Sequence, residues 1–121
     1  KAVEETKNNT GMVLNFALNY GSRDEIISAV KKISSDVMDN KLNKEEINDE
    51  IFSHYLMTSD LKDPDLLIRT SGELRISNFM LWQIAYSELY FTDVLWPDFN
   101  EECFIEAVKE YQNRARRYGG I

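Results

Sequence analysis

Apolar and polar residues follow one another along the chain in blocks that predict short buried strands separated by amphipathic helices. Residues 12–20 form a nearly continuous apolar run, which is typical of a strand buried on both faces of a sheet. Two further compact strands are predicted at 65–70 and 88–92. The first of these two begins just after Pro64, because proline cannot donate a hydrogen bond to a neighbouring strand.

Helical spacing predicts four helices, each of which begins at a polar side chain that can cap it. Ser22 with Glu25 caps a helix that ends at Asp39, and Asn43 with Glu46 caps a helix that runs through Tyr55. Ser77 caps a helix over residues 78–86, and Asn100 caps a helix that ends at Gly119-Gly120. The order strand, two helices, strand, helix, strand, helix predicts an α/β fold with a parallel sheet flanked by helices on both faces. The sequence has no repeat and no internal domain boundary.

Composition and charge argue against several classes of protein. The net charge of -7 argues against nonspecific nucleic-acid binding, which needs a basic face. One cysteine, Cys103, excludes an internal disulfide and a Cys-rich zinc site, and suits a reducing cytoplasm. No apolar run is long enough to span a membrane. The chain starts at Lys1 without a methionine or a signal-peptide pattern, so we expect a piece of a longer protein whose N-terminal part is missing.

The loop after the second predicted strand is the first candidate for binding chemistry, because ligands of open α/β sheets bind at the carboxyl ends of strands. It holds Arg69, Arg75 and the hydroxyl of Ser77 within nine residues. Guanidinium groups suit phosphate oxygens, and amides at the start of the next predicted helix would add to an anion site. Two interpretations stay open, namely a cradle for a phosphate or diphosphate and a polar turn in which Glu73 neutralises an arginine.

Two weaker candidates lie nearby. Glu88 stands between an apolar helix and an apolar strand, where a carboxylate must be solvated, paired or bound to a cation. Mg²⁺ is usually held by one or two carboxylates with substrate phosphates, but pairing with an arginine is the commoner outcome. Arg114, Arg116 and Arg117 fall in the last predicted helical turn, where they complement the helix dipole or form a second anion contact.

The sequence around these candidates closely resembles the C-terminal half of the cis-prenyltransferases, the family of bacterial undecaprenyl diphosphate synthase. The resemblance is carried by residues 15–23, 65–79, 81–83, 87–91, 96–99 and 114–120. The family commonly has Gly-Gly-Arg where this chain has Gly21-Ser22-Arg23. The family's N-terminal Asp-Gly-Asn-Gly-Arg block, which carries its Mg²⁺-binding aspartate, is absent from these 121 residues.

The resemblance implies an activity and a role for each matched residue. The implied enzyme condenses isopentenyl diphosphate repeatedly onto an allylic diphosphate such as farnesyl diphosphate, with Mg²⁺. The product would be undecaprenyl diphosphate, the lipid carrier for bacterial cell-wall peptidoglycan. The matched positions are Arg69, Arg75 and Ser77 for the diphosphate of isopentenyl diphosphate, Glu88 for Mg²⁺, and Arg117 with Gly119 for an ending that reaches the partner's site in a homodimer.

Three hypotheses follow for the complete protein. It is a cytoplasmic cis-prenyltransferase with peripheral membrane contact, a noncatalytic partner of such an enzyme, or a phosphate-binding α/β module with unrelated chemistry. The retained arginines, hydroxyl and carboxylate favour the enzyme. Because the Mg²⁺-binding aspartate is missing, we expect the 121 residues alone to be inactive.

Overall fold

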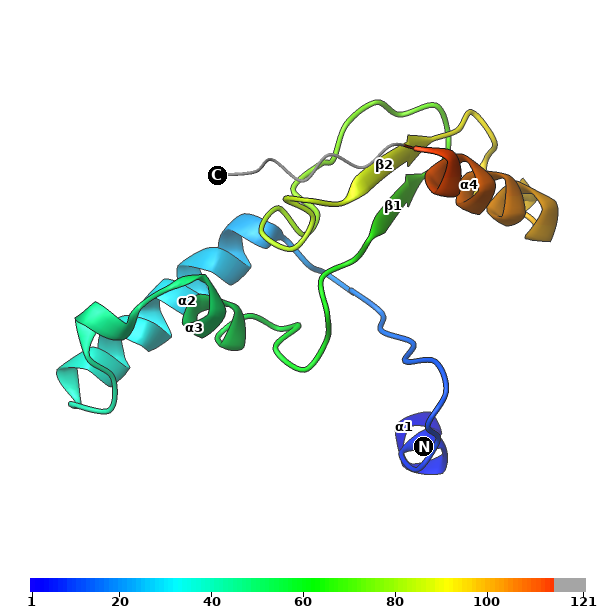
Figure 1. The fold of residues 1–121 in the computed structure, drawn as a ribbon. Helices are drawn as coiled ribbons and strands as arrows, with labels where there is room; N and C mark the ends of the chain where they lie inside the picture. Colours follow the sequence, from blue (N-terminus) through cyan, green and yellow to red (C-terminus); the bar gives the residue numbers. More distant parts are fainter. Residues whose placement is uncertain (115–121) are drawn as a thin grey trace.

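The structure is a computed structural model that describes residues 1–114, and at its centre two short parallel strands lie side by side (Figure 1). β1 spans Leu66–Arg69 and β2 spans Glu88–Phe91. In the register of the pair, Leu66 lies opposite Glu88 and Arg69 lies opposite Phe91. The two strands predicted at 65–70 and 88–92 are therefore confirmed, and the parallel α/β architecture is the one that the order of elements predicts.

Helices occupy most of the remaining regular structure. The α-helices are α1 (Ala2–Thr6), α2 (Ser22–Met38), α3 (Asp49–His54) and α4 (Glu101–Asn113), and the 3-10 turns are η1 (Lys44–Glu46) and η2 (Trp96–Asp98). The side chain of Asn100 caps α4 as expected, by accepting from the backbone N–H of Cys103. The predicted capping box of Asn43 and Glu46 is present but opens η1, while α3 takes its cap from Asn48.

A small apolar core joins the helices to the strands. Its buried members come from α2, β1, α4 and the segments between them: Ala29, Ile33, Leu56, Leu67, Ile84 and Ala107. In Figure 1, α4 lies beside the strand pair, while α2 and α3 lie together at the other side. The hydroxyl of Tyr55 fixes this helix pair by donating to Asp36 Oδ2 of α2 at 2.7 Å.

The prediction of a strand over residues 12–20 is wrong for the chain as described. The segment is extended but unpaired, and Figure 1 shows it (blue) running from α1 to the start of α2. Its apolar side chains are in solvent, with Met12 87% and Leu18 84% exposed. A strand needs a neighbour for its N–H and C=O groups, and the sheet within residues 1–114 has only β1 and β2.

The helix predicted over residues 78–86 is also wrong, because the segment forms successive turns. Ser77, Asn78 and Met80 have φ of 52°, 62° and 48°. These are left-handed values, which a right-handed helix cannot contain. Residues 78–86 therefore offer no helix N-terminus whose amides could add to the anion site at the arginine loop.

Candidate anion-binding site at the carboxyl end of the strands

The turn after β1 is held in place by the segment that follows β2. Ser71 and Gly72 have φ of 71° and 70°. Their backbone N–H groups donate to the carbonyl oxygens of Val94 at 2.8 Å and Thr92 at 2.9 Å. A Cβ at Gly72 would lie 2.9 Å from Asp93 Oδ1, so both the backbone conformation and the space favour glycine here. The carboxyl ends of the two strands are thus tied together.

The structure brings the side chains of Arg69, Arg75 and Ser77 to one point. Arg69 Nη1 donates to Ser77 Oγ at 3.1 Å, and Arg75 Nε donates to the same oxygen at 3.2 Å. Arg69 also donates to the carbonyl oxygen of Arg75. Each guanidinium has five N–H donors, so both keep donors that can face an anion.

Glu73 shares this site with the arginines. Its Oε2 lies 2.7 Å from Arg75 Nη1, and both side chains are well exposed. The ion pair proposed for a polar turn is therefore present beside the converging arginines. Two guanidinium groups against one carboxylate leave the site with a positive charge, which suits a phosphate or diphosphate.

A surface hollow opens next to the shared hydroxyl. It has a volume of about 300 Å³ and is lined by Arg23, Ile76, Ser77, Asn78 and Leu81. Holding a serine such as Ser77 in the left-handed region costs about 1–2 kcal/mol. Such strain persists only where surrounding contacts fix the backbone.

Glu88 lies at the opposite end of the strand pair. It begins β2, whereas Arg69 ends β1, so the four-residue ladder separates the two positions by roughly 10 Å along the strands. Glu88 Oε2 accepts from Arg114 Nη1 at 2.9 Å, and Arg114 also donates to Glu110 and to the carbonyl oxygen of Leu89. Hydrogen bonds to Glu110 and then Glu88 raise the pKa of the Arg114 guanidinium. The carboxylate is therefore paired with an arginine.

A metal site is not complete within the described residues. Among residues 1–114, no three His, Cys, Asp or Glu side chains form a group that could hold a metal ion. One carboxylate is still compatible with Mg²⁺, which takes its other ligands from phosphates, waters and further carboxylates. Glu88 is thus one candidate ligand, and Arg114 competes for it.

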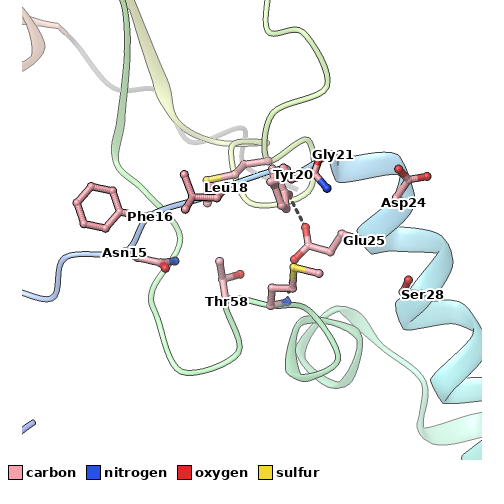
Figure 2. A pocket seen from close by; sticks show the side chains of 13 residues that line it. Asn15, Phe16, Leu18, Tyr20, Gly21, Asp24, Glu25, Ser28 and Thr58 are labelled. Atoms are coloured by element: carbon pink, nitrogen blue, oxygen red, sulfur yellow. Dashed lines mark hydrogen bonds between the residues drawn. The ribbon is translucent and has the colours of Figure 1, made fainter. Parts of the chain in front are cut away.

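A second pocket, of about 250 Å³, lies between residues 15–21 and the start of α2 (Figure 2). Figure 2 shows the carboxylate of Glu25 turned towards Tyr20, whose hydroxyl donates to it. Glu25 is only 3% exposed, and it also accepts from the backbone N–H of Met57 at 2.8 Å and from Gln83 Nε2. Burial, followed by the hydrogen bond to Glu25, raises the pKa of the Tyr20 phenol.

These contacts show that the predicted capping box of Ser22 and Glu25 is wrong. Gly21 is the N-cap residue of α2, and no side chain caps the helix. The side chains of Ser22 and Glu25 instead bond to distant segments, at Leu81 and Met57. The available signal was the spacing of Ser22, Glu25 and Ala29, which places all three on one buried stripe of the helix with Ile33. For Glu88, pairing with an arginine, which was expected as the commoner outcome, is confirmed, and the partner is Arg114. Arg116, Arg117 and Gly119 lie outside the described residues.

Comparison with known proteins agrees with the resemblance found in the sequence. The family model for undecaprenyl diphosphate synthase matches residues 1–119. The chain belongs to this prenyltransferase family. Relatives named isoprenyl transferase are 64% identical in Bacillus cereus, 66% in Geobacillus kaustophilus and 62% in Bacillus subtilis, each over 121 residues. These matches cover 100% of this chain and 47%, 47% and 46% of the respective relatives, so the chain spans about half their length.

Solved structures of the family share this arrangement. The crystal structure of lavandulyl diphosphate synthase from Lavandula x intermedia, in complex with dimethylallyl diphosphate, matches with a TM-score of 0.95 and 40% identity, covering 98% of this chain and 51% of that one. A probable undecaprenyl diphosphate synthase from Campylobacter jejuni matches with a TM-score of 0.79 and 38% identity, covering 97% and 52%. Within the described residues, no helix is long and apolar enough to cross a membrane.

Proposed function

We propose that the complete protein is a cis-prenyltransferase that joins isopentenyl diphosphate to an allylic diphosphate such as farnesyl diphosphate. The observation that carries the proposal is the convergence of Arg69 and Arg75 on the hydroxyl of Ser77. We assign these three residues to the diphosphate of isopentenyl diphosphate. The family membership and the dimethylallyl diphosphate of the lavandulyl diphosphate synthase structure support the choice of substrate class.

The site suits a diphosphate for a physical reason. A guanidinium is planar and can bind two phosphate oxygens at once, and the hydroxyl of Ser77 can donate to a third. When the anion binds, it takes over donors that now face Ser77 and Glu73. The arginines thereby fix the diphosphate end of the substrate and hold its double bond close to the allylic carbon that is to be attacked.

Mg²⁺ is the proposed cofactor, and it would stabilise the negative charge of the diphosphate that leaves the allylic donor. Glu88 is the residue of this chain that would hold it, after release from Arg114. The remaining ligands would come from substrate phosphates and from parts of the complete protein outside this chain. The family's catalytic aspartate belongs to such a part, so we propose that the 121 residues alone do not turn over.

Three broader features belong to the same proposal. The product is undecaprenyl diphosphate, a lipid carrier for cell-wall synthesis in the cytoplasm, made by an enzyme that contacts the membrane peripherally. The protein is a homodimer in which Arg117 and Gly119 reach the partner's site. The family membership and the bacterial isoprenyl transferases among its relatives support these features.

The test is Arg69→Ala in the complete protein. Loss of a charge-assisted contact of about 1.5–3 kcal/mol should raise the KM for isopentenyl diphosphate roughly tenfold to a hundredfold. The KM for the allylic diphosphate should change less than threefold. Steady-state assays that vary one substrate at a time measure both constants, with the isolated 121-residue chain as the inactive control. Equal effects on the two KM values would show that Arg69 is wrongly assigned, and an inactive complete protein would favour the noncatalytic partner.

A further inference from the structure

The first turn of α2 grips the segment beside Ser77 through three hydrogen bonds, here named the clasp. The backbone N–H groups of Ser22 and Arg23 donate to the carbonyl oxygen and to Oδ1 of Asn78, each at 2.9 Å. The hydroxyl of Ser22 accepts from the backbone N–H of Leu81, also at 2.9 Å. The side-chain bonds join positions 55 and 59 residues apart, so the clasp is a tertiary contact.

We propose that Ser22 is a positioning residue for the diphosphate site. By fixing Asn78 and Leu81, which both follow Ser77 in the chain, the clasp holds the hydroxyl of Ser77 where Arg69 and Arg75 meet. The inference rests on the proposed function, because it assigns Ser77 to the diphosphate. It adds a residue that touches neither the substrate nor the arginines.

The backbone geometry explains why such a clasp is needed. Ser77 and Asn78 are both left-handed, and a serine returns to a more favourable conformation unless its neighbours prevent it. Rotation of the Ser77 backbone would carry its hydroxyl away from both guanidinium groups. Two backbone N–H groups of α2 tie Asn78, the next residue, and the Ser22 hydroxyl ties the far end of the same turn at Leu81, so the three bonds together oppose that rotation.

The burial of Ser22 makes its hydroxyl hard to replace. Ser22 is 0% exposed, so water does not reach the oxygen that receives the Leu81 N–H. A variant without this hydroxyl therefore leaves the Leu81 N–H without its acceptor.

The residues of the clasp lie next to the place where a ligand of Ser77 would bind, because they line the same hollow. Arg23, Asn78 and Leu81, which all take part in the clasp, line the hollow of about 300 Å³ together with Ser77. A shift of Asn78 would therefore change the position of the binding hydroxyl and the shape of its surroundings together.

The test is Ser22→Ala in the complete protein, which removes the acceptor and keeps the Cβ. The two backbone bonds to Asn78 stay, and the turn loses its bond at Leu81. We expect the KM for isopentenyl diphosphate to rise fivefold to tenfold, because the loosened turn lets Ser77 leave the arginines for part of the time. The kcat and the KM for the allylic diphosphate should stay within twofold. The matched control is Thr58→Val. It removes one acceptor, at 3.0 Å, of Gln83 Nε2, whose residue lies in the same series of turns but away from Ser77, and it should leave both KM values within twofold.

Equal changes in both KM values for Ser22→Ala, or the same change in Thr58→Val, would show a merely structural role and overturn the inference. If Ser22→Ala does not fold, Asn78→Gly takes its place, since glycine accepts the left-handed backbone and lacks Oδ1. The same selective rise is expected for Asn78→Gly, and an unchanged KM would overturn the inference.

Calorimetry with inorganic diphosphate separates this inference from the proposed function. If the wild-type enzyme turns over and Ser22→Ala has an unchanged KM for isopentenyl diphosphate, only the positioning role of Ser22 is contradicted. A complete protein that does not turn over contradicts the proposed function, and the ratio of diphosphate Kd values then decides the clasp. A fivefold weaker Kd in Ser22→Ala supports it, and an equal Kd or no binding by the wild type overturns it.

Discussion

The two ends of the β1–β2 pair hold arginines in opposite states. At the carboxyl end, Arg69 and Arg75 meet at a neutral hydroxyl, and of the two only Arg75 also pairs with a carboxylate, that of Glu73. At the amino end, Arg114 is engaged by two carboxylates and a carbonyl oxygen. We expect the first arrangement, here called the open end, to accept an anion, and the second, here called the closed end, to stabilise the fold for as long as Glu88 stays paired with Arg114. The partners of an arginine, rather than its presence near a strand end, therefore distinguish binding from support.

The largest expected effect tests the closed end. Arg114→Gln should lower the free energy of unfolding of the complete protein by about 2–3 kcal/mol, because Glu88 and Leu89 lose a charged donor. The Kd for inorganic diphosphate should not change, since the arginines proposed to bind it lie at the other end of the strands. Urea unfolding and calorimetry measure the two quantities.

Lys41→Gln is the control for this change. It also removes a cation with two carboxylate neighbours, Asp36 and Asp39, but the lysine is 65% exposed, so a loss of only ~0.5 kcal/mol is expected. A weaker diphosphate Kd in Arg114→Gln would break the comparison, because the closed end would then support binding.

A smaller loss of stability is expected at the turn after β1, which the segment after β2 holds at the open end. Gly72→Ala should lower the free energy of unfolding by about 1–2 kcal/mol, because alanine disfavours a φ of 70° and its Cβ would press on Asp93. Gly11→Ala is the control, since a Cβ there meets nothing within 4 Å. Thermal unfolding of the complete protein compares the two variants, and equal stabilities would show that the turn adapts to a side chain.

Local sequence patterns predicted the elements that depend on their own residues. β1, β2 and α2 lie where periodicity and Pro64 placed them, and α4 begins at its Asn100 cap. The predicted end of α4 is wrong, because the helix ends at Asn113 and Arg114 has extended backbone instead of lying in the last helical turn. The convergence of Arg69, Arg75 and Ser77 after β1 was also expected and is confirmed, while ligand binding by this loop stays a prediction.

The errors share one physical cause, which is dependence on distant partners. Residues 12–20 have strand composition but no neighbouring strand within the described chain. Residues 78–86 have helical spacing, but the left-handed turn that begins at Ser77 is tied to Ser22 more than fifty positions earlier. The pairing of Glu88 with an arginine was expected, but which arginine was open, because Arg114 lies 26 residues away, where sequence spacing carries no signal.

The smallest expected effect concerns the carboxylate that shares the open end. Glu73→Gln should tighten the binding of inorganic diphosphate about twofold to threefold, because the exposed ion pair with Arg75 is worth only ~0.5 kcal/mol. Glu45→Gln, which removes the exposed partner of Lys44, should leave the Kd unchanged. Calorimetry at low and high salt measures both, and the gain should shrink as salt screens the site. Weaker binding in Glu73→Gln would mean that the carboxylate orients Arg75 towards the anion, and the open end would then rely on a paired arginine just as the closed end does.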